Sequence, residues 1–153
     1  MKVRSWYGLT GEIEVENELW HLVRVGGVAL KHPPIINLLL RRGLPREDRL
    51  YLSFLHEFGH LQTLLVALIH GTLMLFARRR HGRGSLRSLT WKWQALIAHQ
   101  AVWELAAESY TAYYARPRYR QIYRRYPNPL GRSIFWIGML GLAVYFTQRA
   151  VNS

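Results

Sequence analysis

The sequence contains no cysteine among its 153 residues. Disulfide bonds and thiolate metal sites are therefore excluded, and histidine and carboxylate side chains remain as the only strong metal ligands. The lack of cysteine does not indicate a compartment, since such a chain is compatible with any redox environment. No secretory signal is expected, because residues 1–11 lack an apolar run of the required length.

Acidic residues are also scarce. Nine Asp and Glu stand against 21 Lys and Arg, which gives a net charge of +12. Such a surface favours nucleic acid, anionic lipid head groups or an acidic partner, and the alternative is an arginine-rich surface without a dedicated partner. Half of the residues are hydrophobic, so the sequence predicts a folded chain, and its length fits one domain.

Beyond Arg49 only three carboxylates remain, namely Glu57, Glu104 and Glu108. All three lie in otherwise apolar segments, where an unpaired charge would be costly. These carboxylates need partners, and nearby histidines can supply them.

Strand and turn patterns occupy the first part of the chain. Hydrophobic residues alternate with glutamates near residue 13, Asn17-Glu18 predicts a turn, and residues 19–25 and 28–31 predict two further strands. Residues 35–42 predict a short helix.

Two long helices are expected next. The first runs from about residue 45 to 80, with Pro45 in its first turn and acidic residues following, and the second ends near Ala115. A basic, glycine-bearing loop at 78–84 separates them. The sequence thus predicts one mostly helical α+β domain, with a β-rich part at 1–43, a helical hairpin at 44–115, and a basic linker plus apolar C-terminal helix at 116–153.

His56, Glu57 and His60 form an HExxH motif inside the first long helix. Residues four apart lie one turn apart on the same helical face, so both imidazoles can reach one metal ion. Glu57 lies on the flank of that face, where it can hold a metal-bound water as general base. The alternative is a pair of core histidines with Glu57 at the surface.

Glu104 completes a plausible zinc sphere, since two histidines and one glutamate form a known catalytic set with water in the fourth position. In an antiparallel helical hairpin, His60 and Glu104 would lie at matching heights because their midpoint is Gly82, inside the glycine-bearing loop. Glu108 lies one turn beyond Glu104 and is placed to accept the free imidazole N–H of a ligand histidine. Pairing of Glu104 with an arginine is the alternative.

The segment HEFGH and the later pattern E-x-x-A-[acid] at 104–108 resemble the gluzincin metallopeptidases, especially their membrane-linked members and the small minigluzincins. The resemblance runs from about residue 28 to 117. It implies a zincin-like fold, a Zn²⁺ cofactor held by His56, His60 and Glu104, and Glu57 as catalytic base. Glu108 would steady a ligand histidine, although the family more often has Asp there. The activity implied is zinc-dependent hydrolysis of a peptide or protein substrate.

Two long runs without charge, at 61–77 and 133–148, are slightly short for a membrane span but within reach of one. Nearby tryptophans and arginine clusters fit a membrane interface, so we expect membrane association and contact with anionic lipids, and otherwise a cytoplasmic protein. Two rival hypotheses are a non-catalytic helical membrane or lipid-binding module with structural zinc or none, and a basic nucleic-acid-binding protein. Nucleic acid is the less favoured partner, since a solvated or lipid-facing basic stretch is commoner.

Overall fold

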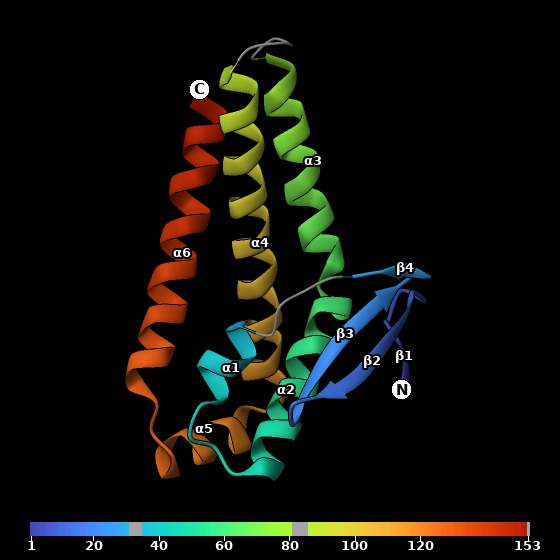
Figure 1. The fold of residues 1–153 in the computed structure, drawn as a ribbon, viewed down its shortest axis with the longest axis vertical. Helices are drawn as coiled ribbons and strands as arrows, with labels where there is room; N and C mark the ends of the chain where they lie inside the picture. Colours follow the sequence, from blue (N-terminus) through green and yellow to red (C-terminus); the bar gives the residue numbers. More distant parts are fainter. Residues whose placement is uncertain (31–34, 81–85, 153) are drawn as a thin grey trace.

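A computed structural model describes residues 1–30, 35–80 and 86–152 and shows a mostly helical α+β fold, as predicted (Figure 1). The predicted turn around Gly82 lies outside the described residues. The elements in chain order are β1 (Lys2–Arg4), β2 (Thr10–Glu16), β3 (Leu19–Val25), β4 (Val28–Ala29), α1 (Ile35–Arg41), α2 (Arg46–Gln62), α3 (Leu64–Arg80), α4 (Leu86–Tyr114), α5 (Arg116–Arg125) and α6 (Pro129–Asn152).

The four strands form an antiparallel sheet in the order β1-β2-β3-β4. The predicted turn at Asn17-Glu18 is confirmed, and both residues have positive φ angles, of 51° and 62°. Such angles suit the two-residue turns whose twist matches antiparallel strands. Sequence reasoning missed β1, which has only three residues and therefore no readable alternation.

The predicted helix from 45 to 80 is two helices. Its break lies at Thr63, and the axes of α2 and α3 differ by 50°. The Thr63 hydroxyl and the Thr63 N–H both donate to the carbonyl of Gly59, at 2.7 and 2.8 Å. A threonine bonded back to the carbonyl four residues earlier favours a helical bend. The predicted basic linker after residue 116 contains a third unexpected element, α5, whose Tyr119, Ile122 and Tyr123 are buried.

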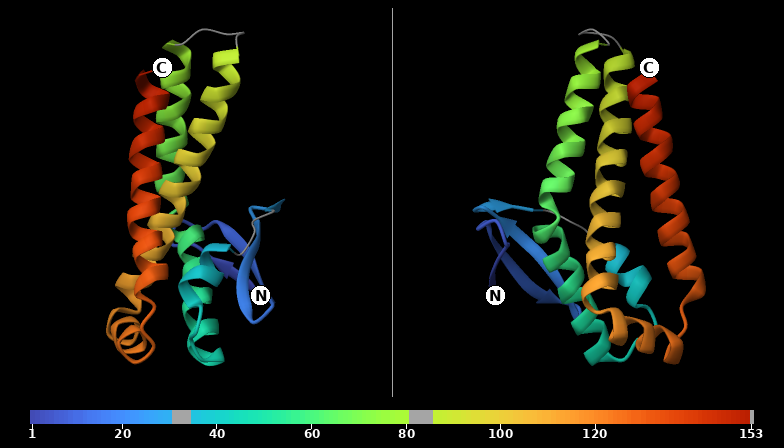
Figure 2. Two further views of the ribbon diagram at one scale, coloured as in Figure 1. Left: turned by 60° about the vertical axis from the view of Figure 1, so that its left-hand side comes forward. Right: turned by 180° about the vertical axis from the view of Figure 1, so that it is seen from behind.

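The elements separate into two ends of the molecule. Figures 1 and 2 show α3, α4 and α6 side by side along the upper part, while the sheet, α1, α2 and α5 gather around the lower part. Each end has its own cluster of buried hydrophobic residues. The lower cluster is Leu44, Leu52, Ala115, Tyr119, Ile122 and Tyr123, and the upper one is Met74, Trp91, Ala95 and Ala150.

Candidate metal centre

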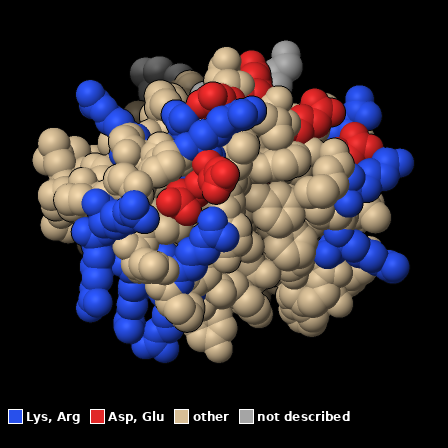
Figure 3. Space-filling model, turned by 90° about the horizontal axis from the view of Figure 1, so that it is seen from below, with Lys and Arg blue, Asp and Glu red and all other residues tan. Residues whose placement is uncertain are grey.

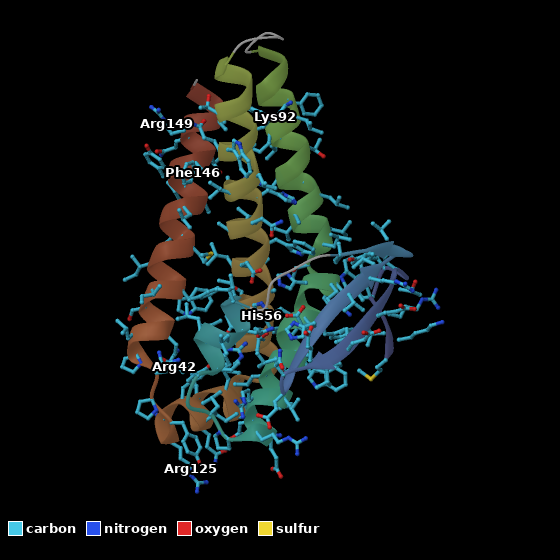
Figure 4. The ribbon with its side chains drawn as sticks, viewed as in Figure 1. Arg42, His56, Lys92, Arg125, Phe146 and Arg149 are labelled. Atoms are coloured by element: carbon cyan, nitrogen blue, oxygen red, sulfur yellow. The ribbon has the colours of Figure 1, made fainter. Side chains whose placement is uncertain are left out.

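The two histidines of the motif lie one turn apart on α2, and His56 lies near the middle of the molecule (Figure 4). His56 and His60 are buried, with 1% and 2% of their surface exposed. Their ring centroids are 4.8 Å apart and the rings are nearly perpendicular. Helical spacing therefore brings both imidazoles together inside the protein, as a shared ion requires.

Glu104 reaches this pair from α4. Its Oε2 lies 3.0 Å from His56 Nε2 and 3.5 Å from His60 Nε2. Two ligand atoms bound at about 2.0–2.1 Å to a tetrahedral zinc ion lie about 3.3–3.4 Å apart. The two distances from Glu104 are close to this value, and the chemistry of the three residues matches a His₂Glu sphere.

Glu57 lies in the same buried group. One possible ligand atom from each of His56, Glu57 and His60 lies within 4.8 Å of the others. Glu57 is also held by two neighbouring elements: its Oε2 accepts a hydrogen bond of 2.9 Å from the backbone N–H of Leu22 in β3, and its Oε1 accepts one from the side-chain amide of Asn37 in α1. Both carboxylate oxygens therefore have fixed positions beside the histidines.

Glu108, one turn beyond Glu104, contacts the other ring nitrogen of His56. His56 Nδ1 donates to Glu108 Oε2 at 2.9 Å, so the carboxylate sets the orientation of the imidazole. Arg41 of α1 donates to the same carboxylate from both terminal guanidinium nitrogens, Nη1 and Nη2, at 2.9 and 2.6 Å, and the Tyr119 hydroxyl donates to it at 2.8 Å. A paired and fully hydrogen-bonded carboxylate can remain charged inside a protein.

The charges of this network change the affinity of its members for protons. Burial lowers the pKa of His56, but hydrogen bonds and charges from Glu104 and Glu108 outweigh it and raise the pKa to about 9. Burial raises the pKa of Glu108, yet the charge of Arg41 and the contacts with His56 bring it down to about 2. Without a metal, His56 is therefore protonated and Glu108 ionised near neutral pH.

Gly59 allows α2 and α4 to approach closely enough for these contacts. A Cβ atom at Gly59 would lie 2.7 Å from the backbone oxygen of Ala107 and 3.2 Å from its Cα. Trp103 adds a further tie, since its indole Nε1 donates to the carbonyl of His60 at 3.1 Å. The His60 and Trp103 rings also meet edge to face, with centroids 4.7 Å apart. The backbone of α4 is thereby fixed beside the motif.

Sequence reasoning named the residues nearest to the candidate ion but missed their supports. Asn37, Arg41 and Tyr119 come from a short helix and from a predicted linker, and neither segment carried a recognisable motif. One signal was available for Arg41: the lone carboxylate Glu108 needed a cationic partner if buried. The chain has 17 other arginines, and only the tertiary fold shows that Arg41 is the partner.

Comparisons with known proteins give no relative for this chain. No family model, no curated protein and no solved structure matches it. The function must therefore be argued from the site itself.

Proposed function

We propose that the protein is a zinc-dependent peptidase of the gluzincin type. The observation that carries the proposal is the position of Glu104 Oε2, 3.0 and 3.5 Å from the Nε2 atoms of His56 and His60. We propose these three residues as the ligands of the ion. A zinc ion at this place supplies a Lewis acid that polarises a carbonyl group and activates water for attack on a peptide bond.

Glu57 would act as the general base. Its carboxylate belongs to the buried group around the ion, so it can take a proton from the attacking water and return it to the leaving amine. The Leu22 N–H and the Asn37 amide hold the carboxylate through hydrogen bonds to its two oxygens. We propose that these two hydrogen bonds orient Glu57 as the base.

Glu108 and Arg41 would prepare His56 as a ligand. Since Glu108 is acceptor-only when ionised, it keeps a proton on His56 Nδ1 and directs the lone pair of Nε2 toward the ion. Arg41 keeps Glu108 ionised through its two charged hydrogen bonds. This outer network resembles the carboxylate support that ligand histidines generally have.

The substrate would be a peptide or protein bound in extended form. The upper part of β3 pairs with β4, whereas the N–H groups of Trp20 and Leu22 point to Ser53 and Glu57 of α2. This stretch of β3 is the sheet edge nearest to the motif. A peptide added along it would bind through the Trp20 end of this edge, in the general mode of β-strand addition, while the Leu22 N–H stays bonded to Glu57.

The test uses Glu57→Gln beside the wild type and a matched control, Glu47→Gln, which removes an exposed carboxylate of the same helix. We expect one zinc per chain in all three proteins and hydrolysis of unstructured protein substrates by the wild type and the control. Glu57→Gln should lose at least about 100-fold in rate, since it lacks the base. Wild-type activity in Glu57→Gln would reject the mechanism, and a wild type without zinc would reject the site.

We also propose that the enzyme works at a membrane with anionic lipids as partners. One helix of the described residues, Pro129–Val151 of α6, is long and apolar enough to cross a bilayer, with mean hydropathy 1.4. Basic side chains spread over the lower face of the molecule, with a few acidic groups between them (Figure 3), which suits anionic head groups. No feature of the described residues favours nucleic acid over lipid.

A non-catalytic membrane protein with a structural zinc ion is the second candidate function. The observation in its favour is the burial of the site: Glu57 and Glu104 are 2% and 3% exposed, whereas catalytic zinc sites keep one position open to water or substrate. Under this alternative, zinc binds at full occupancy and no variant or wild-type protein hydrolyses peptides. Removal of the ion with a chelator would then lower the melting temperature without any loss of an activity.

A further inference from the structure

The upper part of the molecule has a continuous zone without charged side chains. It consists of residues 64–76 of α3, 93–103 of α4 and 133–148 of α6, which we call the apolar belt. None of these stretches contains Asp, Glu, Lys or Arg. The three helices stand side by side over this length in every view (Figures 1 and 2). The belt is therefore a property of a three-helix bundle and not of one helix.

Large hydrophobic side chains cover the outside of the belt. On α6, Ile137 is 74% exposed and Leu140 58%, and on α3 Ile69 reaches 62%. Isolated exposed hydrophobic residues are ordinary on soluble proteins, but a contiguous surface of them is not. The further exposed members are Leu65, Val66, Leu68, Leu73, Leu75, Phe76, Trp93, Leu96, Ile134, Val144 and Tyr145.

The inside of the belt is small and partly polar. His70 of α3 stacks on His99 of α4 with ring centroids 5.9 Å apart, and a hydrogen bond of 3.2 Å joins His70 Nε2 to Thr147 Oγ1 of α6. The buried residues of the belt are mostly alanines, with two larger side chains among them: Ala67, Ala95, Ala98, Ala101, Ala143, Met74 and Phe135. Small residues and interhelical hydrogen bonds inside, with large aliphatic residues outside, are the arrangement of helices packed in lipid.

Basic residues border the belt at both ends. Lys92 and Arg149 lie near its upper border, and Arg42 and Arg125 lie at the lower end of the molecule (Figure 4). Between Arg132 and Arg149, α6 runs for 16 residues without charge, which corresponds to about 24 Å of helix. The uncharged stretches of α3 and α4 are shorter, with 13 and 11 residues or about 20 and 16 Å of helix. A bilayer core is about 30 Å thick, so the belt would be accommodated by local thinning of the bilayer and by long basic side chains that extend to the head groups.

We infer that α3, α4 and α6 cross a lipid bilayer together as a three-helix bundle, with the ends of the bundle on opposite sides of the membrane. The hydrocarbon layer of the bilayer would cover the apolar surface. The belt has no charged residue, its exposed side chains are hydrophobic, and basic residues lie beyond both of its ends. The inference extends the membrane part of the proposed function, on which it rests, and does not depend on peptide hydrolysis.

The same arrangement places the candidate metal centre at the membrane surface. Glu104 directly follows the last belt residue of α4, Trp103, and the α2–α3 break at Thr63 directly precedes the first belt residue of α3. Glu104 and its histidine partners thus lie at the lower limit of the belt on α3 and α4, while the α6 stretch of the belt continues further down, toward α1 (Figure 1). Since more Lys and Arg belong to this end than to the other, we expect it to face the cytoplasm.

The absence of cysteine permits a direct test, because a single introduced cysteine is the only thiol in the chain. We would express three full-length variants, Arg149→Cys, Arg124→Cys and Ile137→Cys, and treat sealed membrane vesicles of known orientation with a membrane-impermeant maleimide. All three positions are exposed in the structure. Arg149→Cys and Arg124→Cys should react from opposite sides, and Ile137→Cys should react only after solubilisation and denaturation.

Each outcome is decisive for one claim. Reaction of both arginine-position variants from the same side would overturn the crossing, as would rapid reaction of Ile137→Cys in sealed vesicles. Release of the wild-type protein by alkaline carbonate would remove membrane insertion altogether. Zinc content and hydrolysis measured on the same preparations in detergent report separately on the proposed peptidase, so its failure cannot be confused with failure of the topology.

Discussion

The two ends of the molecule treat polar groups in opposite ways. Around the candidate metal centre, ionisable side chains are buried and joined to one another: Arg41, Glu108 and His56 form a chain of hydrogen bonds with no surface exposed beyond 1%. In the apolar belt no charged residue is present, and hydrophobic side chains face outward. The first arrangement concentrates charge where a divalent ion can be held, and the second excludes charge where lipid is expected.

This difference shows how one short chain can combine two environments. The lower end satisfies its buried charges by pairing, which is costly to assemble and strongly destabilised when one partner is lost. The belt instead relies on small interior residues and on weak hydrogen bonds such as that between His70 and Thr147. Histidines at the two ends should therefore respond very differently to the same substitution.

The largest effect is expected from His60→Ala, with His70→Ala as the matched control in the belt. His60 is a proposed ligand, so its loss should reduce zinc below about one tenth of an ion per chain after dialysis, whereas His70→Ala should keep about one. Metal analysis of protein purified without added zinc gives the answer. Full occupancy in His60→Ala would exclude our ligand set, and loss in His70→Ala would show that the two regions are not independent.

Next in size is the effect of Arg41→Met, compared with Arg42→Met at the neighbouring exposed position. Arg41 is fully buried beside Glu108, so its removal takes two charged hydrogen bonds from a buried carboxylate and should cost about 3–5 kcal/mol of stability. Arg42→Met should change stability by less than about 0.5 kcal/mol. Denaturant unfolding in a fixed detergent compares the two. Equal stabilities would mean that the network contributes nothing measurable to the lower end.

A smaller effect concerns pH. The folded-state pKa of His56 is raised to about 9 from 6.5, so its contribution to stability is complete below pH 6.5 and is lost as the pH rises through 9. The pKa of Glu108 is lowered to about 2 from 4.5, so its contribution is present above pH 4.5 and lost as the pH falls through 2. In the metal-free protein, these two groups together stabilise the folded state most between pH 4.5 and 6.5.

The measurement is the melting temperature of chelator-treated protein from pH 4 to 9, repeated with zinc. The melting temperature of the metal-free protein should fall as the pH rises from 6.5 to 9. The zinc-loaded protein should show little of this decline, because the ion replaces the proton on His56. Between pH 6.5 and 9, His70→Ala should show the same decline as the wild type. A metal-free protein that gains stability toward pH 9 would contradict the assigned state of His56.

The sequence predicted the parts of the fold that follow from local patterns. The hairpin turn at Asn17-Glu18 and the second long helix, observed at Leu86–Tyr114, required only alternation, turn chemistry and a proline stop. The bend at Thr63 was not predicted, because a single threonine inside an apolar run is a weak signal. Its effect depends on whether the hydroxyl bonds to the preceding turn, which only the structure shows.

For the candidate site, the sequence predicted what lies on neighbouring helical turns and missed what arrives from elsewhere. His56 and His60 were placed together by their spacing, and the hairpin midpoint placed Glu104 at their height. Asn37 and Tyr119, by contrast, reach Glu57 and Glu108 from segments 20 and 11 residues away through the packing of α1 and α5. Contacts of that kind depend on how helices pack and leave no periodic pattern in the chain.

The position of Tyr119 in α5 has a practical consequence for anyone wishing to study the candidate metal centre alone. A shortened protein ending after α4 would lose the hydroxyl that donates to Glu108 and also Tyr123, which accepts from Arg41. It would lose Asn128 as well, whose amide donates to the carbonyl of Leu39 in α1, two residues before Arg41. The candidate metal centre and the apolar belt are therefore interleaved along the chain, and a more polar variant would have to come from redesigning the outer surface of the belt rather than from deleting it.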